Sequence, residues 1–437
     1  MKNLSYPDAL SFLYGLQRFG MKLGLERIRA CLSRLGNPQE SFMSIHVAGT
    51  NGKGSTCFFL ERMLREAGTA VGLYTSPHLR RFEERILVDG HEIEEDYIAG
   101  WISREREHII EESLTFFEAV TAMAFCYFRA RGVELVVCEV GLGGRLDATN
   151  VLLPRCAVIT TIGIDHEEQL GPTKRSVARE KLGIVKEGVP VVTAEEDREI
   201  IALHRDIARE RQAGLFVLGE EVHLRYGGSD RRGSSFDYRS AGMSLGGLEV
   251  RLAGPHQVQN AALAILSLEV ALGAGAVSEG AVRRGLRDAR APGRFEILAT
   301  PRGTVVLDVA HNPAAMQVLV RTSEAVFPGV RPVVVVGMSS DKNGEGVVRI
   351  LSPLAGEFIV TKPDYRRHER KAQAAHLFPV ARSIHGTVCE EPDVGRAVSL
   401  GLERTGGGPF LLVTGSFYTV AEAIAYLEAE GLLPEKM

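Results

Sequence analysis

Three glycines and a lysine directly follow an apolar run in SIHVAGTNGKGST, residues 44–56. Glycine adopts positive φ and lets backbone N–H groups approach an anion closely, and a helix N-terminus adds partial positive charge. Lys53 would reach the β- and γ-phosphates of a nucleotide, and the hydroxyl of Ser55 or Thr56 would face a phosphate or a metal. Gly54 separates Lys53 from Ser55, so the strict patterns GxxxxGKS and GxxxxGKT are not matched. The stretch predicts a variant phosphate-binding loop; its alternative is a glycine-rich turn with a solvated lysine.

A second chemical feature is an acid at the end of an apolar run. Glu139 ends the segment VELVVCE, and α/β proteins place their ligands at the carboxyl ends of parallel strands. A carboxylate there needs a partner such as Mg²⁺, whose preferred ligands are oxygens. The alternative is a carboxylate that caps the glycine-rich turn after the strand, and the residues alone leave both interpretations open.

The elements around these residues predict an α/β fold. A strand, FMSIHV, precedes the glycine loop; a helix from about Ser55 to Ala67 and a strand, AVGLYT, follow it. This order implies a parallel sheet with right-handed crossovers. VELVVCEV is apolar enough for a strand buried on both faces, and RILVDGHEI alternates around Asp89-Gly90 as an edge hairpin. Two helices are expected in the first forty residues, and a helix near 117–130.

The Pro-Gly pair in RAPGRFEIL breaks regular structure and predicts a hinge between two domains. A fresh series of strands follows it: VVLDVA, PVVVVGM, EFIVT and PFLLVTG. We therefore expect an N-terminal domain over 1–295 and a smaller, doubly wound, Rossmann-like domain over 296–437. The polar, glycine-rich segment 227–247 is either a hairpin or a mobile insertion.

Composition restricts the class of protein. The 437 residues are 45% hydrophobic and 24% charged, with a formal net charge of −4. Such a chain has no strong field for nucleic acid or anionic membrane, and no apolar run long enough to span a bilayer. Six cysteines show no CxxC spacing, which favours reduced core thiols. Without the pattern of a signal peptide at the N-terminus, a cytoplasmic location is expected.

The glycine loop, HVAGTNGKGST, resembles the variant P-loop of the folylpolyglutamate synthase/dihydrofolate synthase family, within the Mur-ligase superfamily of ATP-dependent amide-forming enzymes. Further blocks of the family follow in its order between residues 19 and 420, nearly the whole chain. They are FGMKLGLERI, TSPHL, TFFE, EVGLGGRLDATN, IGIDH, AREKLGIVK, GPHQVQNA, DVAHNP and VTGSFYTV. The resemblance implies an N-terminal P-loop NTPase-like domain of the Mur-ligase central type.

The resemblance also implies roles for single residues in the phosphate and metal site. Ser76, Glu139 and His166 match the family's Mg²⁺-binding positions, and Lys53, Lys181 and His166 are expected to be catalytic. Lys181, which from the residues alone is an exposed helix lysine, matches a position that carries a lysine carbamate in related enzymes. Carbamylation needs a neutral amine, and hence a lowered pKa, and would provide oxygens for a second Mg²⁺. Nucleotide contacts are implied at Thr50, Asn51, Gly52, Lys53, Gly54, Ser55, Asn260, Arg294 and Asp308.

A second set of residues is implied to bind the acceptor. A flat pterin ring would stack on Phe116 or Phe117, although adjacent aromatics are more often core. His311 is expected to shape the interdomain cleft, and Asn312-Pro313 are equally well explained as a helix cap and first helical residue. The other implied substrate contacts are Thr115, Glu118, Leu146, Asp147 and Ala148.

The implied reaction is ATP-dependent ligation of L-glutamate to a folate or dihydropteroate carboxylate, with ATP, two Mg²⁺ and a monovalent cation such as K⁺. Substrates would be L-glutamate, dihydropteroate and tetrahydrofolates, and the protein would act as a monomer. A Mur ligase of cell-wall synthesis is an alternative, but only 48 residues precede Gly49, too few for its usual N-terminal domain. A P-loop small-molecule kinase is a second alternative.

The basic run 362–371 is a solvated helix start or attracts the polyglutamate tail of a folate substrate.

Overall fold

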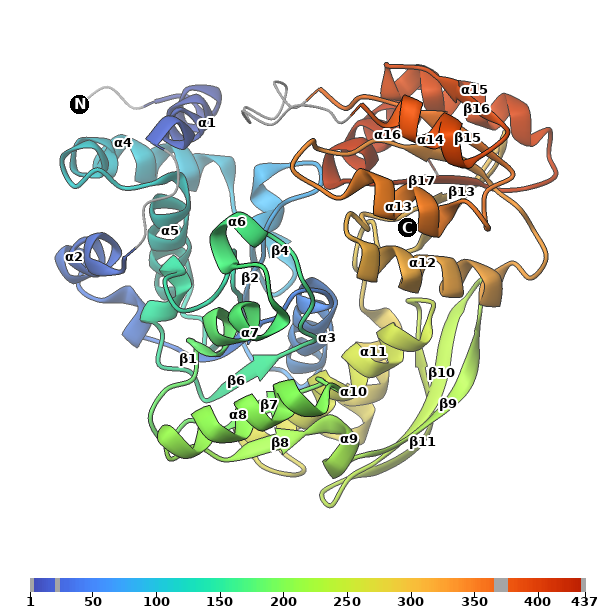
Figure 1. Ribbon diagram of the computed structural model, residues 1–437. Coiled ribbons are helices and arrows are strands. Elements are labelled where there is room, and N and C mark those ends of the chain that lie inside the picture. Colours follow the sequence, from blue (N-terminus) through green and yellow to red (C-terminus); the bar gives the residue numbers. More distant parts are fainter. Residues whose placement is uncertain (1–3, 20–23, 365–375, 434–437) are drawn as a thin grey trace. The chain divides into compact units, whose positions relative to one another are not determined.

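The computed structural model describes residues 4–19, 24–364 and 376–433 (Figure 1). The chain separates into two compact units. The first comprises Met1–Gly227, Ser235–Val250 and Gln257–Ala289, and the second comprises Gly228–Ser234, Arg251–His256 and Arg290–Met437. Most of the basic run 362–371 lies outside the described residues.

An eight-stranded sheet forms the centre of the first unit, in the order β4-β3-β2-β5-β1-β6-β7-β8. The central strand β1 pairs in parallel with β5 and β6, whereas β3 and β4 form the antiparallel edge hairpin. All five residues of β5 are buried, as expected for a continuous apolar run between two helical layers. The strands are β1 (Met43–Ala48), β2 (Val71–Tyr74), β3 (Ile86–Val88), β4 (His91–Glu92), β5 (Leu135–Glu139), β6 (Cys156–Ile159), β7 (Val191–Thr193) and β8 (Leu215–Val217).

Helices of the first unit belong to separate hydrophobic cores. One core joins α1, α2, α4 and α5 with strands β2 and β5, and another joins α7 and α8 with β6 and β7. Helix α3 follows the glycine loop and packs on α11. The helices are α1 (Tyr6–Gly15), α2 (Glu26–Arg34), α3 (Lys53–Glu66), α4 (Glu95–Glu111), α5 (Phe116–Ala130), α6 (Glu167–Leu170), α7 (Lys174–Leu182), α8 (Arg198–Glu210), α9 (Leu218–Glu221), α10 (Pro255–Leu272) and α11 (Glu279–Asp288).

The polar segment 227–247 forms strands. They belong to a three-stranded sheet in the order β11-β10-β9, with β9 at His223–Asp230, β10 at Gly233–Arg239 and β11 at Ser244–Val250. Of the two interpretations left open by the sequence, the hairpin is the one found.

The second unit is built on a six-stranded sheet in the order β12-β13-β17-β14-β15-β16. Only β12 is antiparallel to its neighbour within the described part of this sheet. The strands are β12 (Glu296–Thr300), β13 (Gly303–Leu307), β14 (Val333–Val336), β15 (Glu357–Val360), β16 (Val388–Glu390) and β17 (Leu411–Thr414). The helices are α12 (Pro313–Val326), α13 (Gly344–Leu351), α14 (Leu377–Ile384), α15 (Val394–Thr405) and α16 (Phe417–Ala429).

The fold class expected from the sequence is confirmed: both large sheets are mainly parallel and are joined through helices. The two N-terminal helices and the edge hairpin are also found, and α3 begins two residues earlier than expected. All six cysteines are free thiols, five of them buried. Among the described residues, no helix has the length and apolarity needed to cross a membrane.

Candidate functional site

The glycine loop lies between the carboxyl end of β1 and the first turn of α3, where backbone N–H groups lack helical partners. Gly49 has φ +148° and Gly52 has φ +89°, so both need glycine's freedom. A Cβ at Gly52 would lie 2.5 Å from Oδ1 of Asn260 on α10. The structure therefore places Asn260 directly beside the loop.

Two lysines converge on one carbonyl of this loop. Lys53 Nζ donates to Gly49 O at 3.1 Å and to Thr50 O at 3.2 Å, while Lys181 Nζ donates to Gly49 O at 2.7 Å. Lys181 is 5% exposed, so its interpretation as an exposed helix lysine is wrong. Burial, and then the nearby charge of Lys53, lowers the pKa of Lys181 to about 7. At neutral pH a substantial fraction of this amine is therefore uncharged and able to act as a nucleophile.

The loop is tied to the segment that follows β6. Thr50 Oγ1 donates to Gly163 O and accepts from Gly163 N, both at 2.9 Å, and Asn51 O accepts from Thr160 Oγ1 at 2.7 Å. These bonds bring the segment that leads to His166 against the loop. Gly54 and Ser55 are buried in the first turn of α3. The hydroxyl of Thr56 is buried without a hydrogen-bond partner among the described residues.

The expected metal ligands lie at or after the carboxyl ends of β2, β5 and β6, which belong to one sheet, with β1 between β5 and β6. Glu139 at the end of β5 is 4% exposed, and its Oε2 accepts from the backbone N–H of Ser76 at 3.1 Å. His166 lies after β6, with φ +55°, at the N-cap of α6. Across the part of the chain that the structure describes, no three His, Cys, Asp or Glu side chains gather closely enough to hold a metal. Mg²⁺ is commonly held by one or two carboxylates together with substrate phosphates, so the Glu139 carboxylate fits that cation.

The TFFE block begins helix α5 and is used in its packing. Thr115 and Glu118 form a capping box, and Glu118 also pairs with Arg27 at 3.1 Å. Phe116 stacks on Tyr14 with ring centroids 5.7 Å apart. Thr115 and Glu118 therefore already have hydrogen-bond or ion-pair partners within the protein. Phe116 is partly buried and packs against the hydrophobic core that α5 helps to form.

The LDA block lies in the turn after β5, next to the second phenylalanine. A Cβ at Gly141 would lie 2.5 Å from the ring of Phe117, so the start of the turn that leads to the LDA block adjoins the TFFE block. Asp147 accepts from the backbone N–H groups of Leu142 at 2.9 Å and Thr149 at 3.0 Å. Burial raises the pKa of Asp147, and these hydrogen bonds oppose the rise. Its neighbours Leu146 and Ala148 are half-buried and buried respectively.

In the second unit, the expected nucleotide residues gather at the carboxyl end of β13. Asp308 accepts from the N–H groups of Phe295 and Ala310, each at 2.8 Å. Burial raises the pKa of Asp308, and the guanidinium of Arg294 is among the groups that oppose the rise. Arg294 lies over the ring of Phe417 at 5.2 Å, and the His311 ring lies 6.1 Å from that same ring.

Two observations concern residues beside this group. Phe417, which joins Arg294 and His311, was not among the expected site residues, although it lies in the VTGSFYTV block. Asn312 caps α12, accepting from Ala315 N at 2.9 Å, and Pro313 is the first helical residue. The capping interpretation of Asn312 and Pro313 is therefore confirmed.

Comparison with known proteins agrees with the geometry of both units. The Mur ligase middle domain model matches residues 47–268, and the model described as Mur ligase, glutamate ligase domain, matches 293–417. The dihydrofolate synthase/folylpolyglutamate synthase of Bacillus subtilis is 35% identical, over 96% of this chain and 98% of its own. The Escherichia coli protein of the same name is 34% identical, over 96% and 95%. The chain belongs to the dihydrofolate synthase/folylpolyglutamate synthase family.

Solved structures agree with this assignment. The chain matches E. coli FolC in complex with DHPP and ADP, with a TM-score of 0.88 and 33% identity over 98% of this chain and 99% of that one. It also matches the bifunctional synthase of Yersinia pestis complexed with AMPPNP and Mn ion, with a TM-score of 0.85 and 32% identity over 97% and 98%. The resemblance and the Mur-ligase type of fold expected from the sequence are confirmed, and the family is one of ATP-dependent ligases.

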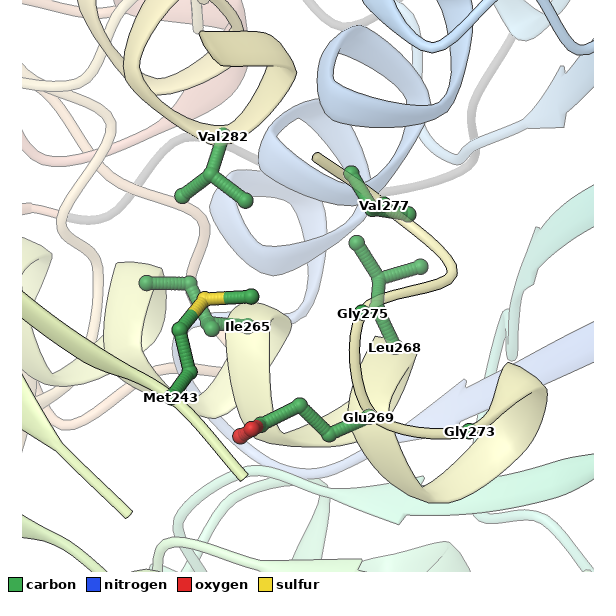
Figure 2. A pocket seen from close by; sticks show the side chains of 8 residues that line it. All are labelled: Met243, Ile265, Leu268, Glu269, Gly273, Gly275, Val277 and Val282. Atoms are coloured by element: carbon green, nitrogen blue, oxygen red, sulfur yellow. The ribbon is translucent and has the colours of Figure 1, made fainter. Parts of the chain in front are cut away.

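A small pocket elsewhere in the first unit does not suit this chemistry. It lies among β11, α10 and α11, and its space of about 10 Å³ is at the lower limit for one water molecule (Figure 2). Its one charged side chain, Glu269, is already bonded to Tyr238 and Ser240. The other lining residues are Met243, Ile265, Leu268, Gly273, Gly275, Val277 and Val282.

Proposed function

We propose that this protein ligates L-glutamate to the carboxylate of a folate or of dihydropteroate at the expense of ATP. A carboxylate is a poor electrophile because its charge repels nucleophiles. Transfer of the γ-phosphoryl group of ATP to it gives an acyl phosphate and ADP. The glutamate amine then attacks the acyl carbon, the C–O bond to phosphate breaks, and an amide and inorganic phosphate are released. The observation that carries the proposal is the convergence of Lys53 and Lys181 on the glycine loop.

The residues of the first unit supply binding and charge neutralisation for the phosphoryl transfer. Loop N–H groups at the start of α3 would hold the phosphates, and Lys53 would leave its loop carbonyls for a phosphate oxygen. Asn260 beside Gly52 would contact the same nucleotide. The complexes of family members with ADP, and with AMPPNP and Mn ion, support ATP and a divalent metal here.

Glu139, with Ser76 and His166, would hold a divalent cation next to the phosphates. Bound there, Mg²⁺ would neutralise developing charge on the transferred group. We further propose that Lys181 is carbamylated: its neutral amine would attack CO₂, release a proton and become an anion with two oxygen donors for a second Mg²⁺. Burial beside Lys53 supports this because it favours the neutral amine. A monovalent cation such as K⁺ is a further proposed ligand.

The acceptor would bind near α5, with its ring against Phe116 or Phe117 and the Leu146–Ala148 turn. The junction of Phe117 with Gly141 supports this placement. In the second unit, Arg294 and Asp308 would contact the nucleotide, and His311 the substrate. We propose that 1–295 binds ATP and the acceptor, and that 296–437 completes the ATP and glutamate sites. Both dihydrofolate synthase and folylpolyglutamate synthase activities are proposed, for a cytoplasmic monomer without nucleic-acid partners.

The test is to incubate the purified protein with ATP, Mg²⁺, L-glutamate and either dihydropteroate or tetrahydrofolate, and to identify the products by mass. We expect each acceptor to gain a glutamyl unit with one ADP and one phosphate released. Stable phosphorylated acceptor would instead indicate a kinase, and ligation of only a cell-wall precursor would indicate the other branch of Mur ligases. Incorporation of ¹³C from labelled bicarbonate at Lys181, lost in Lys181→Met, tests the carbamate separately.

A further inference from the structure

A buried histidine on β1 has no part in the proposed chemistry, yet it joins two parts of the first unit. His46 lies three residues before the glycine loop and is fully buried. Its Nε2 lies 2.8 Å from Oγ1 of Thr149, and Thr149 Oγ1 in turn donates to Oδ1 of Asp147. The other carboxylate oxygen of Asp147 accepts from Leu142 N. A chain of hydrogen bonds therefore runs from β1 to the turn after β5.

The direction of every proton in this chain follows from the donors available. An ionised carboxylate only accepts, so the single hydroxyl proton of Thr149 is directed to Asp147. Thr149 Oγ1 must then accept from His46, which places the imidazole proton on Nε2. Burial, and then the charge of Lys186, lowers the pKa of His46 to about 3, so the ring is neutral at ordinary pH. Its Nδ1 carries no proton and has no partner among the described residues.

The hydroxyl and the histidine exceed what the turn itself requires. The backbone N–H of Thr149 already closes the Asx-type turn on Asp147, at 3.0 Å. A buried Nδ1 without a partner is unfavourable for folding, so the histidine does not improve the core. What His46 and Thr149 add is a fixed orientation of the Asp147 carboxylate. This carboxylate accepts from the N–H of Leu142, the residue after the Gly141 that adjoins Phe117.

We propose that His46 and Thr149 are positioning residues, which hold the Asp147 carboxylate and the Leu142–Asp147 turn in the geometry that binds the heteroaromatic ring of the acceptor. The proposal rests on the proposed function, because it assumes that the acceptor binds at this turn. Neither residue touches the reacting atoms. Their loss should weaken acceptor binding and leave the nucleotide site intact.

The test compares Thr149→Val, which keeps the shape and removes the hydroxyl, with Thr149→Ser, which restores the hydroxyl. We expect Thr149→Val to raise KM for the acceptor about tenfold, the usual effect of losing a hydrogen bond to a charged group, with KM for ATP within about twofold of wild type. Thr149→Ser should remain close to wild type. His46→Leu should behave like Thr149→Val, and His46→Gln, which keeps a donor, should recover part of the loss.

A matched control is Thr405→Val in the second unit, which also removes a buried threonine hydroxyl, bonded there to Leu402 O at 2.8 Å. Thr405→Val should change neither the KM for the acceptor nor the KM for ATP. Equal rises in both KM values for Thr149→Val, or no rescue by serine, would overturn the proposal.

A readout independent of the reaction separates this proposal from the proposed function. Amide hydrogen exchange of peptides covering 141–150 should be faster in ligand-free Thr149→Val than in wild type and unchanged in Thr149→Ser. NMR of ¹⁵N-labelled histidine should show His46 as the neutral Nε2–H form between pH 6 and pH 9, two values chosen well above its pKa of about 3. Unchanged amide exchange in Thr149→Val, or an Nδ1–H form of His46, would overturn the hydrogen-bond chain from His46 to Asp147 even if ligation is confirmed. If no acceptor is ligated, the proposed function fails. The amide exchange and the histidine NMR still decide whether the hydrogen-bond chain from His46 to Asp147 holds the turn.

Discussion

Replacing Lys181 by methionine removes a titrating amine from the interior while keeping the length of the side chain. The pKa of Lys181 falls from 10.5 to about 7, chiefly through burial. One unit corresponds to about 1.36 kcal/mol, so the protonated form is destabilised in the folded state by about 5 kcal/mol. The unfolded chain holds this proton more tightly. Wild-type stability therefore rises with pH between about 7 and 10.5, by about 1.4 kcal/mol for each pH unit.

The quantity to measure is the difference in free energy of unfolding between Lys181→Met and wild type at pH 7 and at pH 9. Every other group titrates alike in both proteins, so the variant's advantage should shrink by about 2 kcal/mol over this range. Urea unfolding followed by the fluorescence of Trp101 reports on the first unit, because this buried residue of α4 is the one tryptophan of the chain. Buffers free of CO₂ keep the amine unmodified.

Lys174→Met is the matched control, on the same helix. Burial of Lys174 is outweighed by its hydrogen bonds to Glu195 and Asp197, at 2.9 and 3.0 Å, so its pKa is raised. It stays charged in both states between pH 7 and pH 9, and its variant should differ from wild type by a constant amount. A constant difference for Lys181→Met as well would refute the lowered pKa, and with it the physical basis for a carbamate.

Further predictions concern the loop and its ligands. Gly52→Ala should destabilise the protein by about 2 kcal/mol and abolish ATP binding measured by calorimetry, because its left-handed φ and the 2.5 Å approach to Asn260 exclude a Cβ. Gly68→Ala, with φ +85° and open space around it, should bind ATP normally; equal binding by both variants would contradict this. Lys53→Met should lower ligase turnover by about 10²- to 10³-fold at unchanged stability, and turnover near wild type would show that the lysine is not used. Chelation of divalent metal should stop ADP release and Mn²⁺ should restore it; full activity in chelator would exclude a metal requirement.

The parts of the fold that could be predicted from the sequence are those fixed by local pattern. Continuous apolar runs such as those of β5 and β14 specify strands buried on both faces, and glycine punctuation marks the loop after β1. The sequence pattern does not predict strands β12 and β16. FEILAT, which contains β12, follows a Pro-Gly pair that indicates a hinge, and β16 has only three residues, too few for a clear pattern.

The expectation that Lys181 is exposed is wrong because the burial of a side chain depends on long-range packing. The helical spacing does carry a signal of burial: Val177 and Ala178 lie four and three residues earlier and face the core, which puts Lys181 on the buried side of α7. The bond from its Nζ to Gly49 O joins residues 132 positions apart, and no local pattern encodes it. The contact between Asn260 and Gly52 is of the same kind.

The most direct test of the central claim follows the oxygen atoms of the acceptor carboxylate. With dihydropteroate labelled by ¹⁸O at that carboxylate, formation of an acyl phosphate and attack by L-glutamate must transfer one ¹⁸O to each phosphate released. Mass spectrometry of the phosphate should therefore show one labelled oxygen for each amide formed. Phosphate without ¹⁸O, released while amide accumulates, would contradict an acyl phosphate and the account of this site built on it.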